Sequence, residues 1–426
     1  MTPRIEGART GLALRAYLAA SRAIPLLAPA ILRRRLERGK EDPDRWQEKL
    51  GRPALARPNG RLVWLHAVGL GEVLALRGLI EAMARHDAGL SFLVTSTARS
   101  SAKVAGANLS ARTVHQFLPL DAPRYLARFL DHWRPDLAVW SEQDLWPGAV
   151  AAAHARGIPQ AFVNARITAA SARRRGVATA LYRDTLSRFA LIAAQEDGTA
   201  MRLKDLGAAS VTITGSLKSA APPLSADPVV LAQLRDRLAG RKVWVAASTH
   251  PGDETEAIWA ARAFRDDPAE LLILVPRDPA RSGEVRAHLA REGLSFASRS
   301  AGEAPGPETS VWLADTFGEL GLWYRLADRA LIGGGFNAIG GHNPWEAACL
   351  DTAILHGPDI ANFAADYAAL HAADAAREVA PGALTDALRA PDLPQVALRA
   401  RTLVDGARGA LDPLATDLVA LMESRA

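Results

Sequence analysis

The amino-acid sequence predicts an α/β protein made of two doubly wound domains in tandem. Its 426 residues suit two domains, because a domain usually has about 100–200 residues. Hydrophobic residues make up 49% and charged residues 23%, which argues against a disordered chain, a collagen-like repeat or a polytopic membrane protein. Short apolar runs alternate with helical stretches, and this alternation is typical of parallel β-α-β units.

The first 52 residues carry the surplus of positive charge. They hold 12 basic and 6 acidic side chains, whereas the rest of the chain holds 39 basic and 40 acidic ones. Residues 12–32 are rich in Ala and Leu but include Arg15 and Arg22, and each Arg in a spanning helix costs roughly 2.5–3.5 kcal/mol. The basic run Arg33–Arg35 follows and suits anionic lipid headgroups. We therefore predict that residues 1–52 form a membrane-associating segment; the alternative is a solvated basic helix packed on the first domain.

The predicted domains follow this segment. The first covers residues 53–219, a Pro-rich linker covers residues 220–226, and the second domain covers residues 227–426. The predicted strands are Leu62–His66, Ser91–Thr95, Thr113–Phe117, Asp136–Trp140, Gln160–Val163, Leu191–Ala194 and Val211–Ile213, then Val243–Ala247, Leu271–Val275, Val311–Leu313, Ala330–Ile332 and Thr352–Leu355. In such sheets ligands bind outside the carboxyl ends of the strands, so we expect the functional residues in loops that follow strands.

Cysteine usage and common motifs exclude several classes of site. Cys349 is the only cysteine, so the chain has no internal disulfide, Cys-rich zinc site or iron–sulfur cluster, and it resembles a cytosolic protein. No HExxH, GxxxxGK[ST] or GxSxG motif is present, which argues against a zincin, a P-loop NTPase and an α/β-hydrolase. The nearly neutral charge beyond residue 52 argues against a nucleic-acid groove across the domains.

A candidate base follows the first predicted strand. Gly69 and Gly71 allow a tight turn, and Glu72 then opens the next helix, where a carboxylate can take a proton from a sugar hydroxyl. The alternative is that Glu72 only complements the helix dipole.

Two further candidates belong to the same domain. Glu142 to Asp144 follow the fourth strand and suit a cation or the hydroxyls of a substrate, although they also suit an ordinary helix start before Pro147. Lys218 lies after the last strand and is placed to meet a phosphate or carboxylate; the alternative is a solvated surface lysine.

The second domain offers a cation and a glycine-rich loop. Arg277 can present its guanidinium to a phosphate or a base edge, unless Asp278 holds it in a local ion pair. Farther on, glycines 333–335, 340 and 341 precede a helix start, for which we predict Asn343 as the N-cap and Pro344 at the first position. The N–H groups of such a loop bind phosphate, and Glu346 can accept hydrogen bonds from ribose hydroxyls. A pure capping role would leave the glycines unexplained.

Taken in order, these motifs resemble those of the lipopolysaccharide Kdo transferases, the 3-deoxy-D-manno-octulosonic acid transferases of Gram-negative bacteria. The resemblance covers nearly the whole chain. The matching segments are Gly39–Asp42, Leu50–Gly51, His66–Val68, Gly71–Glu72, Leu145–Pro147, Asn164–Arg166, Ala247–His250, Asp315–Thr316, Gly318–Leu320 and Gly340–Asn343. It implies an α/β fold of the GT-B type, in which two Rossmann-like domains face a central cleft.

The resemblance also implies a function. It implies an inverting glycosyltransferase that moves Kdo from CMP-Kdo to a lipid A precursor of the lipid IVA type, with Glu72 as the general base. Glu142 and Lys218 match positions that steady the transition state. The residues that match CMP-binding segments are Pro276, Arg277, Gly318, Glu319, Leu320, Asn343, Pro344, Trp345 and Glu346. The resemblance implies no cofactor and no metal ion, and a place at the cytoplasmic face of the bacterial inner membrane, held peripherally or by one N-terminal anchor.

Several positions depart from the family pattern. The usual Glu-Thr-Glu is Glu142, Gln143 and Asp144 here, a common serine is Gly69, and a usual histidine is Asp278. Trp345 replaces a smaller aliphatic residue. These departures keep the proposed base but leave open a divergent GT-B transferase with another acceptor or a UDP-sugar donor.

Overall fold

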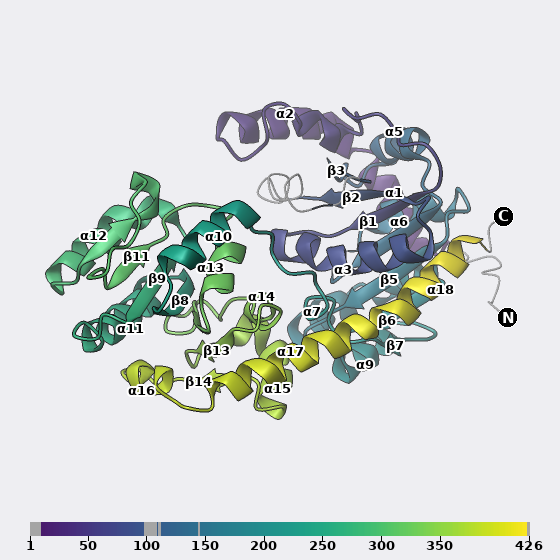
Figure 1. The fold of residues 1–426 in the computed structure, drawn as a ribbon. Helices are drawn as coiled ribbons and strands as arrows, with labels where there is room; N and C mark the ends of the chain where they lie inside the picture. The colour runs from purple at the N-terminus through teal and green to yellow at the C-terminus, as the bar shows by residue number, and fades with distance from the viewer. Residues whose placement is uncertain (1–9, 98–108, 110–111, 144, 424–426) are drawn as a thin grey trace. The chain divides into compact units, whose positions relative to one another are not determined.

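The computed structural model describes residues 10–97, 109, 112–143 and 145–423, which fold as two compact units (Figure 1). The first unit holds the described residues up to Ala221 and those from Ala407 onward, and the second runs from Pro222 to Gly406. Among the described residues, each unit contains one seven-stranded parallel sheet. The prediction of two α/β domains with parallel sheets is confirmed.

The sheet of the first unit has the strand order β3-β2-β1-β4-β5-β6-β7. Its strands are β1 Leu62–His66, β2 Ser91–Ser96, β3 Thr113–Phe117, β4 Leu137–Ser141, β5 Gln160–Ala165, β6 Leu191–Ala194 and β7 Thr212–Ile213. Successive residues of β1 point to opposite faces, so Val63 and Leu65 join one core cluster while Leu62 and Trp64 join another. Because helices cover both faces, β1 is buried along its whole length.

Helices connect these strands. They are α1 Leu12–Ser21, α2 Ile24–Glu37, η1 Trp46–Leu50, α3 Leu70–His86, α5 Pro123–Trp133, α6 Pro147–His154, α7 Ala169–Gly176, α8 Thr179–Leu186 and α9 Asp197–Asp205. The strand order reverses beside β1, since β2 pairs with one edge of β1 and β4 with the other. The loops after β1 and β4 therefore meet at one edge of the sheet.

The sheet of the second unit has the strand order β10-β11-β9-β8-β12-β13-β14. Its strands are β8 Lys242–Thr249, β9 Glu270–Pro276, β10 Phe296–Ser298, β11 Val311–Leu313, β12 Arg329–Ile332, β13 Ala353–His356 and β14 Arg377–Glu378. The sequence analysis missed β10 and β14, which are three- and two-residue edge strands, too short to give a periodic signal. The order reverses between β8 and β12, so this unit repeats the plan of the first.

The second unit is also covered by helices on both faces of its sheet (Figure 1). They are α10 Pro228–Arg237, α11 Pro251–Ala263, η2 Pro279–Arg281, α12 Ser282–Arg291, η3 Arg299–Ala301, α13 Leu320–Leu326, α14 Trp345–Ala348, η4 Ala361–Phe363, α15 Ala364–Ala372, α16 Leu384–Leu388 and α17 Leu393–Gly409.

The last helix, α18 Leu411–Glu423, corrects the predicted domain assignment. The sequence analysis gave residues 227–426 to the second domain, but residues 407–426 belong to the first unit. There α18 packs against α3 and adds Leu414, Ala415 and Leu418 to the core (Figure 1). Domain boundaries read from the sequence assign consecutive segments to one domain. They therefore miss a C-terminal helix that returns to the first sheet. The division after Ala221 falls inside the predicted linker 220–226.

The N-terminal helices α1 and α2 belong to the first unit. Ala28 and Leu32 of α2 are buried against Leu50, Ala122 and Tyr125. No helix among the described residues is long and apolar enough to cross a membrane. One face of α2 therefore packs on the first unit, as the alternative in the sequence analysis expects.

Candidate functional site

The first candidate site lies at the strand reversal of the first unit. His66 at the end of β1 pairs in register with Trp140 near the end of β4. Glu72 is in the first turn of α3, which follows β1, and Glu142 comes directly after β4. The sheet thus places the two carboxylates at one edge, as expected for loops at a reversal point.

Glu72 is half-buried, and one of its oxygens is fixed by the backbone. Oε2 accepts a hydrogen bond from the N–H of Val68 at 2.8 Å. Burial raises the pKa of Glu72, and the nearby Glu142 carboxylate raises it further, while the N–H groups of Val68 and Gly69 and the charge of Lys218 act against both. Glu72 lies in the first turn of α3, where the helix dipole favours it, as the alternative expects, yet the raised pKa also makes it a stronger base than an ordinary glutamate.

Glu142 and Lys218 form a shielded ion pair. Lys218 Nζ lies 2.9 Å from Glu142 Oε1, and the two side chains are 11% and 4% exposed. Lys218 is therefore not a solvated surface lysine, which was the alternative left open by the sequence. Glu142 has a φ of 65°, a left-handed conformation that is uncommon outside glycine and often marks functional sites.

Asn164 is a positioning residue that the site prediction left out. It is the last but one residue of β5, with a φ of 50°, and is fully buried. Its Nδ2 donates to Glu142 Oε1 at 3.4 Å, and its Oδ1 accepts from Gln195 Nε2 at 2.8 Å and from the N–H of Leu217 at 3.0 Å. Asn164 thus joins the loop of Glu142 to the turn of Lys218. The available signal was an asparagine in a matching segment at the end of a strand, since asparagine tolerates left-handed backbone.

A hollow of about 560 Å³ opens beside Glu72. It is lined by Val68, Glu72, Gln143, Ser171, Arg174, Arg175, Ala178, Leu181 and Tyr182. Gln143 is exposed, and its carbonyl accepts a hydrogen bond from Arg175. Asp144, the third residue of the acidic motif, lies outside the described residues. The carboxylate of Glu72 is therefore at the wall of a hollow.

The second candidate site lies at the strand reversal of the second unit. Asp253, in the first turn of α11, is fully buried. Its Oδ2 accepts from the N–H groups of His250 at 2.9 Å and Gly334 at 2.7 Å, and its Oδ1 accepts from the N–H of Phe336 at 3.0 Å. One carboxylate thus joins the loop after β8 to the loop after β12. The site prediction missed Asp253, because an acid at a helix start has a simpler capping explanation.

Five N–H groups of the glycine-rich loop already donate to acceptors of the protein itself, so these five are not free to bind a phosphate. The N–H groups of Gly333, Gly334, Phe336, Gly340 and Gly341 donate to Ala247 O, Asp253, Asp253, Asp359 and Gly334 O, respectively. Glycine is needed for another reason: a Cβ on Gly333 would lie 2.4 Å from the carbonyl oxygen of Ser248. The glycines allow close packing of backbone on backbone.

The helix start after this loop also differs from the prediction. Helix α14 has four residues and begins at Trp345, with Pro344 rather than Asn343 in the N-cap position. Asn343 Oδ1 accepts from the N–H of Trp345 at 3.1 Å, so Asn343 still caps the turn from one residue farther away. The dipole of so short a helix is small, and it offers little attraction for a phosphate.

Two histidines and a glutamate lie around this turn. His250 Nε2 and His342 Nε2 are 3.0 Å apart. Burial lowers the pKa of His342 to about 4, and the charges of His250 and Arg277 add to this effect. Burial raises the pKa of Glu346 to about 7, although the hydrogen bond from the amide of Asn343 and the charge of Arg277 both lower it. Near neutral pH this cluster therefore contains an uncharged imidazole and a carboxyl close to its titration point.

Arg277 is exposed and is not held by Asp278. Asp278 Oδ1 instead accepts from the N–H of Ala280 at 3.0 Å, and no ion pair joins Asp278 to Arg277 in the described part of the chain. The ion pair weighed in the sequence analysis is therefore wrong. Arg277 remains available to an anionic ligand at the end of β9.

The other predicted nucleotide contacts are more dispersed. Glu319, which precedes α13, accepts from Arg299 Nη2 at 2.7 Å and from Thr316 Oγ1. Burial opposes ionisation of Glu319, but these bonds lower its pKa overall. Trp345 is buried in the core and donates its indole N–H to Asp366 at 2.7 Å. Pro276 and Pro344 are buried, Gly318 is exposed with a φ of 88°, and Leu320 is half-buried.

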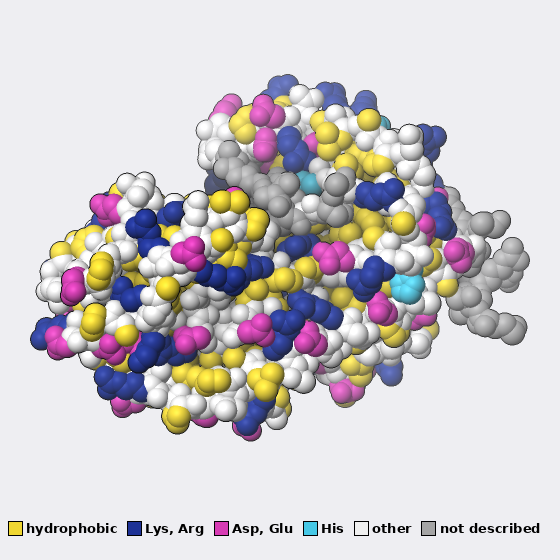
Figure 2. Space-filling model, in the orientation of Figure 1, with side chains coloured by type: hydrophobic (Ala, Val, Ile, Leu, Met, Phe, Trp, Pro, Cys, Tyr) yellow, Lys and Arg dark blue, Asp and Glu magenta, His cyan; other side chains and the backbone are white. Residues whose placement is uncertain are grey.

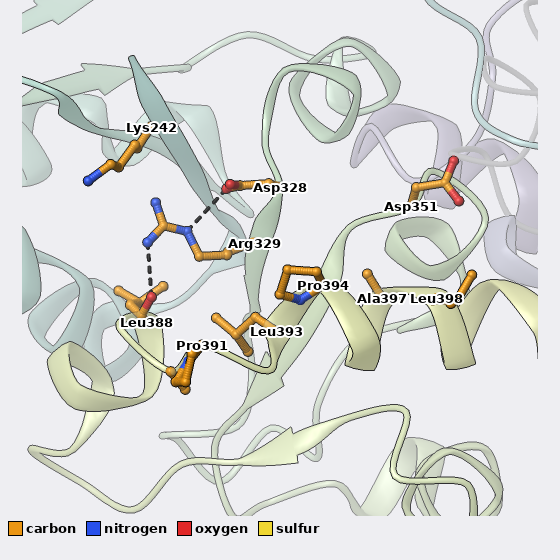
Figure 3. A pocket seen from close by; sticks show the side chains of 11 residues that line it. Lys242, Asp328, Arg329, Asp351, Leu388, Pro391, Leu393, Pro394, Ala397 and Leu398 are labelled. Atoms are coloured by element: carbon orange, nitrogen blue, oxygen red, sulfur yellow. Dashed lines mark hydrogen bonds and ion pairs between the residues drawn. The ribbon is translucent and has the colours of Figure 1, made fainter. Parts of the chain in front are cut away.

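A different hollow lies at the amino ends of β8 and β12 (Figure 3). Its buried cation, Arg329, is committed to Glu270 at 3.0 Å, to Asp328 at 3.1 Å and to the carbonyl of Leu388 at 2.9 Å. It lies at the edge of this sheet that is opposite to the second candidate site. Within the described ranges, no group of three or more His, Cys, Asp or Glu residues is arranged to hold a metal ion.

Comparisons with known proteins agree with the motif resemblance. The family model for 3-deoxy-D-manno-octulosonic-acid transferase (Kdo transferase) matches residues 44–221. A 3-deoxy-D-manno-octulosonic acid transferase of Bordetella pertussis is 39% identical over 362 residues, 81% of this chain and 78% of that protein. A probable mitochondrial 3-deoxy-D-manno-octulosonic acid transferase of Arabidopsis thaliana is 35% identical over 349 residues, 80% of this chain and 78% of that protein. The UDP-GlcNAc 2-epimerase of Neisseria meningitidis bound to UDP-GlcNAc has a TM-score of 0.56 at 12% identity, covering 86% of this chain and 100% of that chain, a likeness of fold.

Proposed function

Since the chain belongs to the Kdo transferase family, we propose that it transfers Kdo from CMP-Kdo to a lipid A precursor of the lipid IVA type. In this proposal each unit has its own task. The first unit supplies the base and the second unit binds the nucleotide. The reaction inverts the anomeric carbon and uses no metal ion or cofactor.

The observation that carries the proposal is the state of Glu72. Its carboxylate borders a hollow of about 560 Å³, while its neighbour Glu142 is neutralised by Lys218 at 2.9 Å. Burial and Glu142 raise the pKa of Glu72. A base with a raised pKa at the wall of a substrate-sized hollow is what deprotonation of a sugar hydroxyl requires.

The proposed reaction is one displacement. Glu72 takes the proton of the acceptor hydroxyl as the oxygen attacks the anomeric carbon of Kdo. The new glycosidic C–O bond forms while the bond from that carbon to the phosphate oxygen of CMP breaks, and CMP leaves with the bonding electron pair. Lys218, held by Glu142 at 2.9 Å, places its ammonium group beside the reacting groups, where it stabilises negative charge that develops in the transition state.

The nucleotide is assigned to the second unit. Arg277 is exposed at the end of β9 and has no ion pair with Asp278, so its guanidinium can pair with the phosphate of CMP. Glu346 and Asn343 offer acceptors for ribose hydroxyls. The segment from Gly318 to Leu320 and the packed residues Pro276, Pro344 and Trp345 complete the proposed CMP site by resemblance. Five backbone N–H groups of the glycine-rich loop are engaged within the protein, so we assign most of the recognition to side chains.

A membrane surface is assigned to α2. One face is buried, while Leu26, Leu27 and Ile31 on the other are 81%, 67% and 53% exposed. Exposed arginines follow at 33–35, and Figure 2 shows cationic, acidic and hydrophobic side chains in the region of α2. A packed helix with an apolar outer face and a basic end suits the interface of an anionic membrane. We assign the protein to the cytoplasmic face of the bacterial inner membrane.

The decisive experiment is mass spectrometry of the lipid after incubation with CMP-Kdo and a tetraacylated lipid A precursor. The proposal predicts that the lipid gains Kdo and that CMP is released in equal amount. Thermal-shift titrations with CMP and with UDP form the matched control, because a nucleotide that binds the native state raises its stability. An unmodified lipid together with a preference for UDP would replace the proposed donor by a UDP-sugar.

Sedimentation with vesicles tests the membrane surface. Replacing Leu26 and Leu27 by Asp leaves the buried face of α2 intact and is expected to weaken sedimentation with anionic vesicles. The matched control is Leu398→Asp, which changes a leucine of the second unit that is 66% exposed. Equal loss in both variants, or no loss in either, would remove α2 as the contact surface.

A further inference from the structure

Tyr17 carries a hydrogen bond from the N-terminal segment into the first unit. It belongs to α1, and its hydroxyl donates to Asp121 Oδ2 at 2.6 Å. Asp121 lies in the turn between β3 and α5 and is 3% exposed. Burial and the charge of Asp121 raise the pKa of Tyr17 above its usual range, so the phenol keeps its proton and remains a donor. The bond is therefore charge-assisted, which is the stronger class of protein hydrogen bond.

The same carboxylate oxygen holds the start of α6. Asp121 Oδ2 accepts a second hydrogen bond, from the N–H of Gly148 at 2.9 Å. Gly148 is the second residue of α6, and the helix follows Trp146, whose indole N–H can only donate. Asp121 thus supplies the acceptor that an N-cap side chain would otherwise give. A Cβ on Gly148 would lie 2.6 Å from Asp121 Oδ1, so this close approach needs glycine.

The start of α6 also ends the loop that carries Glu142. This loop joins β4 to α6, and Leu145 within it belongs to the same core cluster as Ala149 of α6. Asn164 donates to the side chain of Glu142 at the beginning of the loop, and Asp121 holds the helix at its end. The left-handed backbone of Glu142 thus lies between two attachments. The second attachment depends on a donor from α1.

Helix α1 is attached to a second wall of the candidate site. It lies beside α6 (Figure 1) and also packs against α8. On α8, Asp184 Oδ2 accepts a hydrogen bond from the N–H of Gly11, the residue before α1, at 2.9 Å. Leu181 and Tyr182 of the same helix line the hollow beside Glu72. The N-terminal helix therefore contacts both the helix that ends the Glu142 loop and a helix that forms the hollow.

We propose that Tyr17 is a positioning residue for the Glu142 loop, so that the N-terminal segment supports catalysis as well as membrane contact. The inference rests on the proposed function, which assigns this loop to the transfer reaction. A merely structural role would satisfy the buried Asp121 and stabilise the fold, and nothing more. A positioning role has a further consequence, because burial and the charge of Glu142 raise the pKa of Glu72. Displacement of Glu142 changes the reaction and its pH dependence.

The experiment compares Tyr17→Phe with Ser21→Ala in the full chain, with the acceptor in detergent micelles. Each variant removes one hydroxyl from α1, but Ser21 Oγ donates only to the carbonyl of Leu18 in the same helix, at 3.0 Å. Tyr17→Phe is expected to lower kcat about 10-fold, the cost of a small misplacement of reacting groups, with both KM values changed less than about twofold. Ser21→Ala is expected to leave kcat unchanged.

The pH profile separates positioning from stability. Tyr17→Phe is expected to move the acid limb of kcat/KM, the side of the profile that falls with falling pH, to lower pH. The reason is that a displaced Glu142 raises the pKa of Glu72 less. An acid limb that stays in place, or an equal loss of kcat in Ser21→Ala, would overturn the inference.

Vesicle binding separates positioning from anchoring. Tyr17→Phe is expected to sediment with anionic vesicles as the unaltered protein does, because Tyr17 lies outside α2, to which the membrane surface is assigned. A turnover that falls only in proportion to vesicle binding would show that α1 acts as an anchor alone and would reject the positioning role.

Two further measurements follow the link through Asp121. In Asp121→Asn, adding Tyr17→Phe is expected to cost less than it costs alone, because the charged acceptor is already gone; additive losses would reject Asp121 as the link. Hydrogen exchange of residues 145–150 is expected to quicken in Tyr17→Phe and not in Ser21→Ala. This exchange does not depend on the reaction. Faster exchange in a protein that transfers no Kdo supports the link and rejects the proposed function, whereas unchanged exchange rejects the link.

Discussion

The two units place different kinds of cluster at the same point of the same sheet plan. In the first, the Glu72 cluster consists of Glu72, Glu142, Lys218 and Asn164, beside β1 and β4. In the second, the Asp253 cluster consists of His250, Asp253, His342 and Glu346, beside β8 and β12. Each cluster lies where the strand order of its sheet reverses. In the first unit this is beyond the carboxyl ends of β1 and β4, and in the second unit it is beyond those of β8 and β12.

The clusters differ in what their charges do. In the Glu72 cluster the ion pair joins two side chains, Glu142 and Lys218, and leaves Glu72 beside a hollow. In the Asp253 cluster the buried carboxylate of Asp253 accepts hydrogen bonds from three backbone N–H groups, and these bonds fix the shape of two loops. One sheet plan therefore supports a site suited to proton transfer and a site suited to rigid binding, and substitutions can separate them.

The largest effect is expected for Glu72→Gln. Loss of a positioned general base lowers the turnover about 10²- to 10⁴-fold, while the amide keeps the size of the side chain. Kdo transfer measured as CMP release reports the loss, and CMP affinity measured by thermal shift is expected to stay unchanged, because the Asp253 cluster is untouched. Unchanged turnover would remove Glu72 as the base, and weakened CMP binding would show that the two clusters are not separable.

The next largest effect is expected for Glu346→Gln, on stability. The pKa of Glu346 is raised to about 7 in the folded protein, from a value of 4.5 in the unfolded chain. The protonated carboxyl therefore contributes its full share of the folding stability below pH 4.5, and this share is lost as the pH rises through about 7. The shift corresponds to roughly 3 kcal/mol. Glu346→Gln is therefore expected to be more stable than the unaltered protein at pH 8, with a difference that vanishes at pH 4, in urea unfolding.

Comparing variant with unaltered protein isolates Glu346 from its neighbour. His342 has a pKa lowered to about 4, so its contribution is present above the unfolded value and is lost as the pH falls, opposite in direction. That contribution is shared by both proteins and cancels in the difference. A difference that does not depend on pH would contradict the assignment of the titration to Glu346.

A smaller effect on stability is expected for Asp253→Asn. The amide replaces one acceptor oxygen by a donor that faces a backbone N–H, so at least one buried N–H loses its partner, at a cost of about 2 kcal/mol. Thermal unfolding is expected at lower temperature, and CMP affinity is expected to fall with it, because the glycine-rich loop is no longer fixed. The matched control is Glu270→Gln, which alters the buried partner of Arg329 at the amino ends of the strands and leaves the loop bonded to Asp253. A loss of CMP affinity in the control as well would mean that general destabilisation, and not the loop, is responsible.

How much of this could be predicted from the sequence depends on whether a feature is local. The predicted strands agree with the observed ones to within two residues at each end, because strands buried on both faces read as continuous apolar runs. Candidates after strands, such as Glu72 and Glu142, could be found because parallel sheets gather their carboxyl ends at one edge.

Features that depend on tertiary contact could not be predicted in this way. Nothing in the spacing indicates that Lys218 meets Glu142, or that Asn164 joins their loops, since these contacts form only when three loops converge. Glycine content suggests free N–H groups, whereas several N–H groups of the predicted phosphate cradle have acceptors within the protein, among them Asp253 and Asp359. Residues 407–426 were misplaced for the same reason, as helix α18 returns to the first sheet.

The smallest expected effect is a shift in pH dependence for Glu142→Gln, and it tests which cluster governs catalysis. The base must be deprotonated, so activity falls as the pH falls through the pKa of Glu72. Burial and Glu142 both raise that pKa, while Lys218 lowers it. Glu142→Gln removes the negative charge of Glu142 and frees Lys218, so it lowers the pKa of Glu72. The acidic side of the plot of kcat/KM against pH is therefore expected to move to lower pH, whether or not the maximum value of kcat/KM changes. Glu346→Gln is the matched control, because Glu346 also titrates, at about 7, in the other unit. An acid limb that moves with Glu346→Gln and stays in place with Glu142→Gln would transfer the reactive role to the second unit.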